Sequence, residues 1–266
     1  MAELLHTRVV GETGTPLVFL HGLFGQGRNF TQVAKALQPD FRSLLVDLPN
    51  HGRSPWVDAV SYEQMADAVA ATVRADFAPA GRVDVVGHSM GGKVAMMIAL
   101  RHPDLVDRLV VVDIAPTSHS SGGEFEHLLG SLARVDLASL KRRSDADEQL
   151  QGPIPNDTVR GFLLQNLRAA DPADTGGAAF GWQANLDVLR RDLPVIGDFP
   201  ELGTTFDRPV LWIAGETSDY VRPEHHDAMR RLFPRTRSVT IKGAGHWVHS
   251  EQPESFVSAL RVFLGA

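Results

Sequence analysis

The sequence predicts an α/β protein with one mostly parallel central sheet, flanked by helices, and an inserted helical cap. Three observations support this fold class. Short, continuous apolar runs alternate with longer helical patterns along most of the chain. The runs lack apolar–polar alternation, which is typical of strands buried on both faces of a parallel sheet. One long interval carries helical patterns without a strong strand signal, which indicates an insertion.

Each predicted element follows from its own local pattern. Continuous apolar runs predict strands at 16–22, 42–49, 82–88, 108–116, 208–216 and 237–246. Helices are predicted between these strands and at the end of the chain, at 29–39, 61–77, 90–103, 222–234 and 252–264. In the second of these helices, Ser61 and Gln64 have the spacing of a capping box, and apolar residues then repeat on one face. Such alternation predicts right-handed crossovers between parallel strands.

The interval between the fourth and fifth predicted strands is the expected cap. It spans about ninety residues, which is too long for an ordinary connection. Helical patterns within it cover 123–136, 138–150, 156–170 and 181–196. The stretch 171–181 is the most linker-like part and predicts a turn. We therefore expect core residues 1–116, a helical cap at 117–207, and the second part of the core at 208–266.

Composition excludes several classes of function. The net charge is −6 and no basic run is longer than 141–143, so nucleic acid is not an expected partner. The chain has no cysteine, which excludes disulfides, thiolate metal sites and a cysteine nucleophile. The first residues do not resemble a secretion signal, and no apolar run approaches the length of a membrane span. We expect a cytoplasmic protein without a membrane span.

Two motifs overlap in the segment 87–93, GHSMGGK. Read as G-x-x-x-x-G-K, it resembles a phosphate-binding loop, but such a loop needs Ser or Thr next, and Val94 follows. Read as G-x-S-x-G, it fits a nucleophile elbow centred on Ser89, with a predicted strand before it and a predicted helix after it. The small residues on either side of the serine permit the sharp turn that this motif requires. The segment therefore predicts Ser89 as a nucleophile.

A serine nucleophile needs a base to accept its proton. His246 follows the last predicted strand and a glycine-rich turn, so it is the expected base. His249 is the alternative, although it lies nearer the terminal helix. An oxyanion would be held by two backbone N–H groups. The expected donors are Met90, directly after the serine, and Leu23, in the loop after the first predicted strand, where His21 is expected to brace the turn.

Five segments of the chain resemble a known family: FLHGLFGQGRNF, DLPNHGRS, GHSMGGKVAM, VVDIAP and GAGHWVHSEQPESF. Together they are similar to the α/β-hydrolase superfamily. They resemble in particular its YbfF-like bacterial esterases and the related abhydrolase-domain-containing animal hydrolases. The resemblance spans nearly the whole chain. It implies the α/β-hydrolase fold and hydrolysis of carboxylic esters or thioesters by a serine, with no cofactor. A metal site is not expected either, because His225 and His226 are adjacent on a predicted helix and cannot share one face as ligands.

The third member of the expected catalytic triad has two candidates. Most of the superfamily places this acid after the penultimate strand as G-x-x-D, but here the segment 215–219 reads GETSD, so Asp219 comes one residue late. Asp113 ends a run of apolar residues at the carboxyl end of an earlier predicted strand. A buried carboxylate there needs a charged or hydrogen-bonding partner, which an imidazolium provides. The subgroup resemblance also implies an acid on that strand, so we expect Asp113, with Asp219 as the alternative.

The expected partner is a small-molecule ester or thioester with a short to medium acyl chain. Five aromatic residues are expected to line the substrate pocket, although each could instead belong to the ordinary core: Phe24, Phe125, Phe162, Trp182 and Trp247. Two other classes of function remain open. One is a cofactor-free haloperoxidase or a C–C bond hydrolase that uses the same triad. The other is a non-catalytic ligand receptor on the hydrolase fold.

Overall fold

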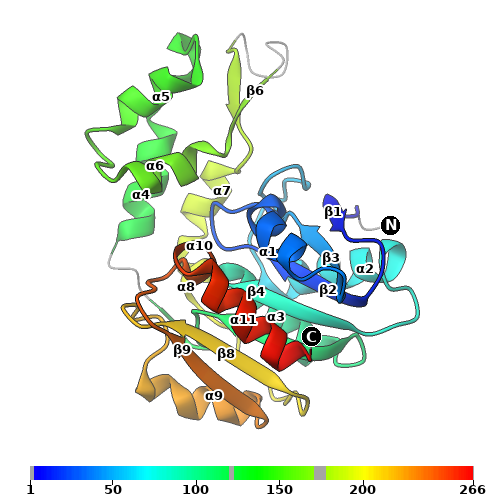
Figure 1. Cartoon of the computed structure of the whole chain (residues 1–266). Helices are drawn as coiled ribbons and strands as arrows, with labels where there is room; N and C mark the ends of the chain where they lie inside the picture. Colours follow the sequence, from blue (N-terminus) through cyan, green and yellow to red (C-terminus); the bar gives the residue numbers. More distant parts are fainter. Residues whose placement is uncertain (1–2, 120–122, 171–177, 266) are drawn as a thin grey trace.

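The main sheet of the computed structural model has seven strands, in the order β1-β3-β2-β4-β5-β8-β9 (Figure 1). Residues 3–119, 123–170 and 178–265 are described. The strands are β1 (Thr7–Val10), β2 (Thr15–Leu20), β3 (Phe41–Val46), β4 (Val83–His88), β5 (Val106–Val112), β8 (Val210–Gly215) and β9 (Thr236–Ile241). All neighbouring pairs are parallel except β1 and β3. The predicted α/β-hydrolase fold class, with a mostly parallel sheet, is confirmed.

Helices cover both faces of this sheet. Three pack on one face: α2 (Tyr62–Asp76), α3 (Met90–Arg101) and α9 (His226–Leu232). Two pack on the other: α1 (Thr31–Ala36) and α11 (Pro253–Leu264). Short helical turns complete the core: η1 (Gly27–Phe30), η3 (Pro223–His225) and α10 (Val248–Glu251). Successive side chains of β2 point to opposite faces, so Leu17 and Phe19 join one apolar cluster and Val18 joins the other.

The segment between β5 and β8 includes the group of helices and the short strand pair drawn above the sheet in Figure 1. Its helices are α4 (Glu124–Ala133), η2 (Leu137–Ser139), α5 (Arg143–Leu150), α6 (Asp157–Leu164), α7 (Leu186–Arg191) and α8 (Leu193–Gly197). It also contains a two-stranded antiparallel sheet of β6 (Leu167–Ala169) and β7 (Phe180–Trp182). The turn expected at 171–181 falls mainly on residues outside those that the structure describes. The boundaries of the cap at 117 and 207 stay a prediction.

Three strands were not expected from the sequence. β1 lies at the sheet edge, pairs with β3 alone, and leaves Arg8 and Val9 exposed, so it lacks the continuous apolar run of a central strand. β6 and β7 have three residues each and were too short to produce a clear periodicity.

The carboxyl ends of β4, β5 and β8 carry the loops that position the site described below. Because neighbouring strands here are parallel, residues that follow each strand meet at one edge of the sheet. Within the described part of the chain, no helix has the length and apolar character needed to span a membrane.

Candidate active site

Ser89 occupies a strained turn between β4 and α3. Its φ of 52° lies in the left-handed region, which costs a non-glycine residue about 1–3 kcal/mol. Its N–H donates to the Val112 carbonyl of β5 at 2.9 Å, so the sheet holds this conformation. The flanking glycines are required by close packing: a Cβ on Gly87 would lie 2.2 Å from the Gly91 oxygen, and one on Gly91 would lie 2.4 Å from the His21 oxygen. The local geometry is that of a nucleophile elbow.

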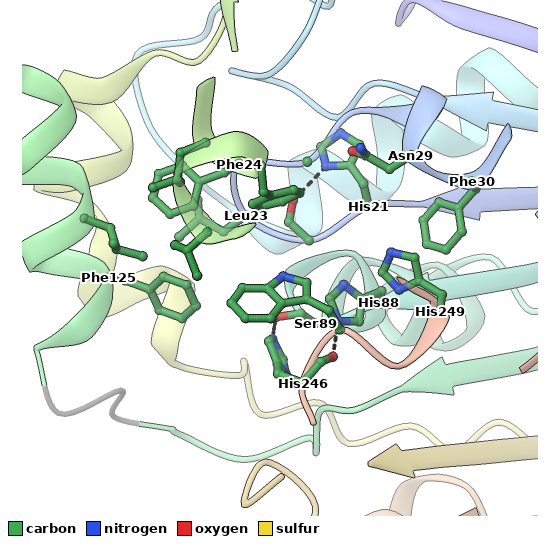
Figure 2. A pocket seen from close by; sticks show the side chains of 17 residues that line it. His21, Leu23, Phe24, Asn29, Phe30, His88, Ser89, Phe125, His246 and His249 are labelled. Carbon is green, nitrogen blue, oxygen red and sulfur yellow. Dashed lines mark hydrogen bonds between the residues drawn. The ribbon is translucent and has the colours of Figure 1, made fainter. Parts of the chain in front are cut away.

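His246 bridges Ser89 and Asp113. Its Nε2 lies 3.0 Å from Ser89 Oγ, and its Nδ1 lies 2.8 Å from Asp113 Oδ2 (Figure 2 shows the His246–Ser89 contact). A carboxylate only accepts hydrogen bonds, so Nδ1 carries the proton and Nε2 is free to accept the serine hydroxyl proton. The imidazole side chain is 13% exposed, so a small reactant can reach it. The arrangement can remove a proton from Ser89.

Asp113 is fully buried and has a φ of 51° at the end of β5. Besides His246, it accepts hydrogen bonds from the Gly215 N–H at 3.0 Å and from Ser218 Oγ at 2.5 Å. These partners compensate the burial of its carboxylate. The alternative acid, Asp219, is exposed and pairs with Arg222 at 2.8 Å. The structure therefore brings Asp113, and not Asp219, to His246.

Ser218 is a site residue that the sequence reasoning passed over. It occupies the last position of the G-x-x-D pattern, where most of the superfamily carries the acid, and it donates to the carboxylate of Asp113 instead. The signal was the departure from the pattern itself: a hydroxyl stands where a carboxylate is usual. With the acid at the end of β5, a small side chain at position 218 can donate a hydrogen bond to it.

The two residues expected to donate to an oxyanion lie beside Ser89. Leu23 and Met90 line one cavity together with Ser89, and neither amide donates to a protein group within the described ranges. Met90 is the first residue of α3, where N–H groups are unpaired and the helix dipole favours negative charge. The Leu23 loop is braced by His21, whose Nδ1 donates to the Gly22 oxygen at 2.8 Å and whose Nε2 accepts from the Leu48 N–H at 2.9 Å.

Three buried or partly buried histidines surround the site without contacting Ser89 Oγ. Burial lowers the pKa of His21 to about 4, lowers that of His249 to about 4, and holds the pKa of His88 well below its usual value. His88 Nε2 donates to the His246 backbone oxygen at 2.8 Å. The rival base, His249, packs against Phe30 and His88 instead (Figure 2). Of these three rings, His88 is the one that contacts His246, through the backbone hydrogen bond and a ring-to-ring distance of 4.8 Å.

Ser89 lies between two cavities. On one side is a narrow slot of about 20 Å³, whose wall includes four of the five predicted aromatic residues: Phe24, Phe125, Phe162 and Trp247. The slot shares Phe162 and Trp247 with a groove of about 910 Å³ between α1, α6 and α11. On the other side is a cleft of about 720 Å³ that is lined by Met90, Lys93 and Tyr220. The fifth predicted residue, Trp182, lies in a separate groove beside Trp56, which Ser89 does not line.

Comparisons with known proteins agree with this geometry. Residues 15–253 match the family model described as alpha/beta hydrolase fold. The chain is 40% identical to sn-1-specific diacylglycerol lipase ABHD11 of Mus musculus, over 93% of this chain and 80% of that protein. It is 31% identical to esterase YbfF of Escherichia coli, over 94% of this chain and 93% of that protein.

A comparison with solved structures also finds an esterase similar to this chain. A structure described as a marine microorganism esterase superposes with a TM-score of 0.92 at 34% identity, covering 98% of this chain and all of that one. The family match covers most of the chain, and the relatives named here are esterases and lipases. The chain therefore belongs to the α/β-hydrolase family and is a hydrolase.

Proposed function

We propose that this protein hydrolyses carboxylic esters or thioesters, with Ser89 as nucleophile, His246 as general base and Asp113 as the acid that orients the base. The observation that carries the proposal is the hydrogen-bond chain from Asp113 through His246 to Ser89, at 2.8 and 3.0 Å, which ends beside an open cleft. This is the arrangement that activates a serine hydroxyl.

The reaction follows from the chemistry of these groups. His246 Nε2 takes the Ser89 proton while Oγ attacks the substrate carbonyl, and the Leu23 and Met90 N–H groups receive the developing oxyanion. His246 then gives its proton to the leaving alcohol or thiol as the acyl-enzyme forms. Water, deprotonated by His246, attacks the acyl-enzyme, and the acid product leaves with Ser89 restored. Asp113 keeps Nδ1 protonated throughout and stabilises the charged imidazole.

The proposed substrate part is an apolar acyl group of short to medium length. The slot of about 20 Å³ has room for little more than a water molecule, so the acyl chain would extend into the groove of about 910 Å³ that shares Phe162 and Trp247 with the slot. Phe24 belongs to the core, whereas Phe125 and Phe162 come from the segment proposed as the cap, so both parts of the chain contribute to the wall. Burial of an apolar chain against such side chains contributes about 0.8 kcal/mol for each methylene group. The relatives named as esterases and lipases support an ester as substrate.

The test combines labelling with turnover. Wild-type protein should react with a fluorophosphonate probe and hydrolyse p-nitrophenyl esters. Ser89→Ala should abolish labelling and lower turnover by about a thousandfold or more. Ser118→Ala is the matched control, because Ser118 lines the same cleft and its hydroxyl bonds Asp198 rather than a histidine. Wild-type turnover in Ser89→Ala would exclude the proposed mechanism.

The same assays separate the other functions that the sequence left open. A non-catalytic receptor on this fold should label poorly and turn over no ester. A haloperoxidase or C–C bond hydrolase should label at Ser89 but hydrolyse simple esters slowly compared with its own substrate. A panel of p-nitrophenyl esters and acyl thioesters of increasing chain length then defines the acyl group and the leaving group.

A further inference from the structure

The ring of His246 is the end of a column of three stacked rings. Tyr220 lies face to face with His246, with ring centroids 4.0 Å apart and planes 22° apart. His119 lies on Tyr220 in turn, with centroids 4.0 Å apart and planes 30° apart. Tyr220 comes from the loop after β8, and His119 comes from the segment that leads from β5 toward α4. Three separate parts of the chain therefore meet in one column.

The column contacts the face of the His246 ring, whereas the hydrogen bonds of His246 lie in the plane of the ring. Nε2 and Nδ1 bond Ser89 and Asp113 in the plane of the ring, and these bonds do not prevent rotation about the line that joins the two partners. A stacked phenol ring does restrict that rotation. Its π face also attracts a cation, which favours the protonated imidazole over the neutral one. Burial raises the pKa of Tyr220, so the phenol stays neutral and keeps this character.

The far end of the column is attached to the nucleophile helix. The His119 N–H donates to the Gly197 oxygen at 2.7 Å, and the same oxygen accepts from Lys93 Nζ at 2.7 Å. Lys93 also donates to the carbonyl oxygens of Asp198 at 2.7 Å and Ile196 at 3.3 Å, at the end of α8. Its side chain is 1% exposed and it lies one turn after Ser89 on α3. Gly197 has no room for a side chain, because a Cβ there would lie 2.8 Å from the His119 oxygen.

Given the proposed function, on which this inference rests, we propose that Tyr220 and His119 are positioning residues for His246. They fix the plane of its ring and stabilise its protonated form, while Lys93 holds the far end of the column through Gly197. The base would then be supported on three sides: Ser89 and Asp113 in the plane of the ring, and Tyr220 on its face.

Several charged and titratable groups surround the column. The groups that face His246 are Asp113, His88, His249 and Tyr220. Those that act on Tyr220 are Glu124, Asp219 and Asp113. Those that act on His119 are Asp219, Lys93, Arg222 and His246. Burial is the largest influence on His119 and lowers its pKa, so His119 stacks on Tyr220 as a neutral ring at neutral pH.

The test is a comparison of Tyr220→Leu with Tyr220→Phe. Leucine removes the π face, whereas phenylalanine keeps the ring and removes only the hydroxyl. Losing the stack destabilises the imidazolium, so Tyr220→Leu should lower the plateau of kcat/KM about threefold to tenfold. The apparent pKa of the acid limb, measured from pH 5 to 9, should fall by about half a unit to one unit. Tyr220→Phe should leave both the plateau and the limb close to wild type.

The readout separates positioning from a merely structural role. Loss of folded protein would lower the plateau without moving the limb, and a thermal unfolding curve for each variant detects it. His119→Leu should shift the limb in the same direction by a smaller amount, because Tyr220 keeps its contact with His246. An unchanged apparent pKa of the acid limb in a folded Tyr220→Leu variant would overturn the inference, as would an equal shift of this pKa in Tyr220→Phe.

Failure of the inference is distinguishable from failure of the proposed function. If wild-type protein neither labels with fluorophosphonate nor hydrolyses esters, the proposed function is wrong. If wild-type protein does both and the apparent pKa of the acid limb is unchanged in Tyr220→Leu, only the column inference is wrong.

Lys93→Met tests the attachment of the column to α3. Met has a similar length but donates no hydrogen bond, and a folded variant should show part of the limb shift of Tyr220→Leu. A folded Lys93→Met variant with a wild-type limb would remove Lys93 from the proposal.

Discussion

Replacement of Ser218 by alanine removes one hydrogen bond from the Asp113 carboxylate, and it also removes the hydroxyl oxygen that accepts the Tyr220 N–H at 3.3 Å. In the wild type, Ser218 Oγ donates to Asp113 Oδ2 at 2.5 Å, and the same oxygen accepts from His246 Nδ1 at 2.8 Å. The other carboxylate oxygen keeps the Gly215 N–H. The variant therefore perturbs the carboxylate that faces His246 without exposing a new charge or opening a large space.

The size of the expected loss of activity follows from the type of hydrogen bond that is removed. A hydrogen bond to a charged group contributes about 1.5–3 kcal/mol to stability, more than a neutral one. Ser218 is partly exposed, so water can replace part of the lost interaction, which reduces the expected effect to about 1–2 kcal/mol. If this energy appears when His246 becomes charged in the transition state, kcat for ester hydrolysis should fall about fivefold to thirtyfold.

The assay is steady-state hydrolysis of a short p-nitrophenyl ester, with Thr217→Val as the matched control. Thr217 is the neighbouring hydroxyl in the same turn, but it bonds the Ala244 oxygen at 3.1 Å rather than Asp113. Thr217→Val should therefore stay within about twofold of wild type in kcat, since its hydroxyl does not contact the acid. A wild-type kcat in Ser218→Ala would refute the reasoning, and so would an equal loss in both variants.

Two further predictions concern the acid of the triad and the buried His249. Asp113→Asn should lower kcat by orders of magnitude because His246 adopts the wrong tautomer, whereas Asp219→Asn should stay close to wild type; the reverse pattern in steady-state kinetics would reassign the acid. The pKa of His249 is about 4 in the folded protein, below the ordinary value of 6.5, so between these values the unfolded chain binds more protons and stability falls as pH falls. His249→Phe removes this loss: thermal or urea unfolding at pH 5 and pH 7.5 should show the variant gaining about 1–2 kcal/mol on wild type at the lower pH, and an unchanged difference would contradict the sign.

The central strands were predictable because their burial produces a pattern that a single sequence contains. Strands buried on both faces, such as β4 and β5, read as continuous apolar runs. β1 has one face toward solvent and one unpaired edge, so its residues need not be apolar. β6 and β7 pair with each other but have only three residues each, and nothing in either triplet indicates a partner.

The candidate site was predictable where a local motif determines the position of a side chain. The G-x-S-x-G turn and the end of β5 place Ser89 and Asp113 through backbone geometry alone. Tyr220 and His119 lie about one hundred residues apart in sequence. They meet because they follow β8 and β5, which end at the same edge of the sheet. No periodicity records such a contact. Lys93 was visible only as part of a rejected phosphate-binding motif, and its carbonyl partners lie at the end of α8.

The positive φ angles of Ser89 and Asp113 have a consequence for the unfolded chain. Each strained residue is held by an N–H that donates to the next strand, from Ser89 to Val112 and from Asp113 to Ile213. Without β4, β5 and β8 in register, both residues relax to ordinary backbone conformations and point their side chains elsewhere. A newly made or partly unfolded chain therefore carries an ordinary, unreactive serine. Under the proposed function, the reactivity of Ser89 therefore depends on the completed sheet, because only the paired strands hold Ser89 and Asp113 in these conformations.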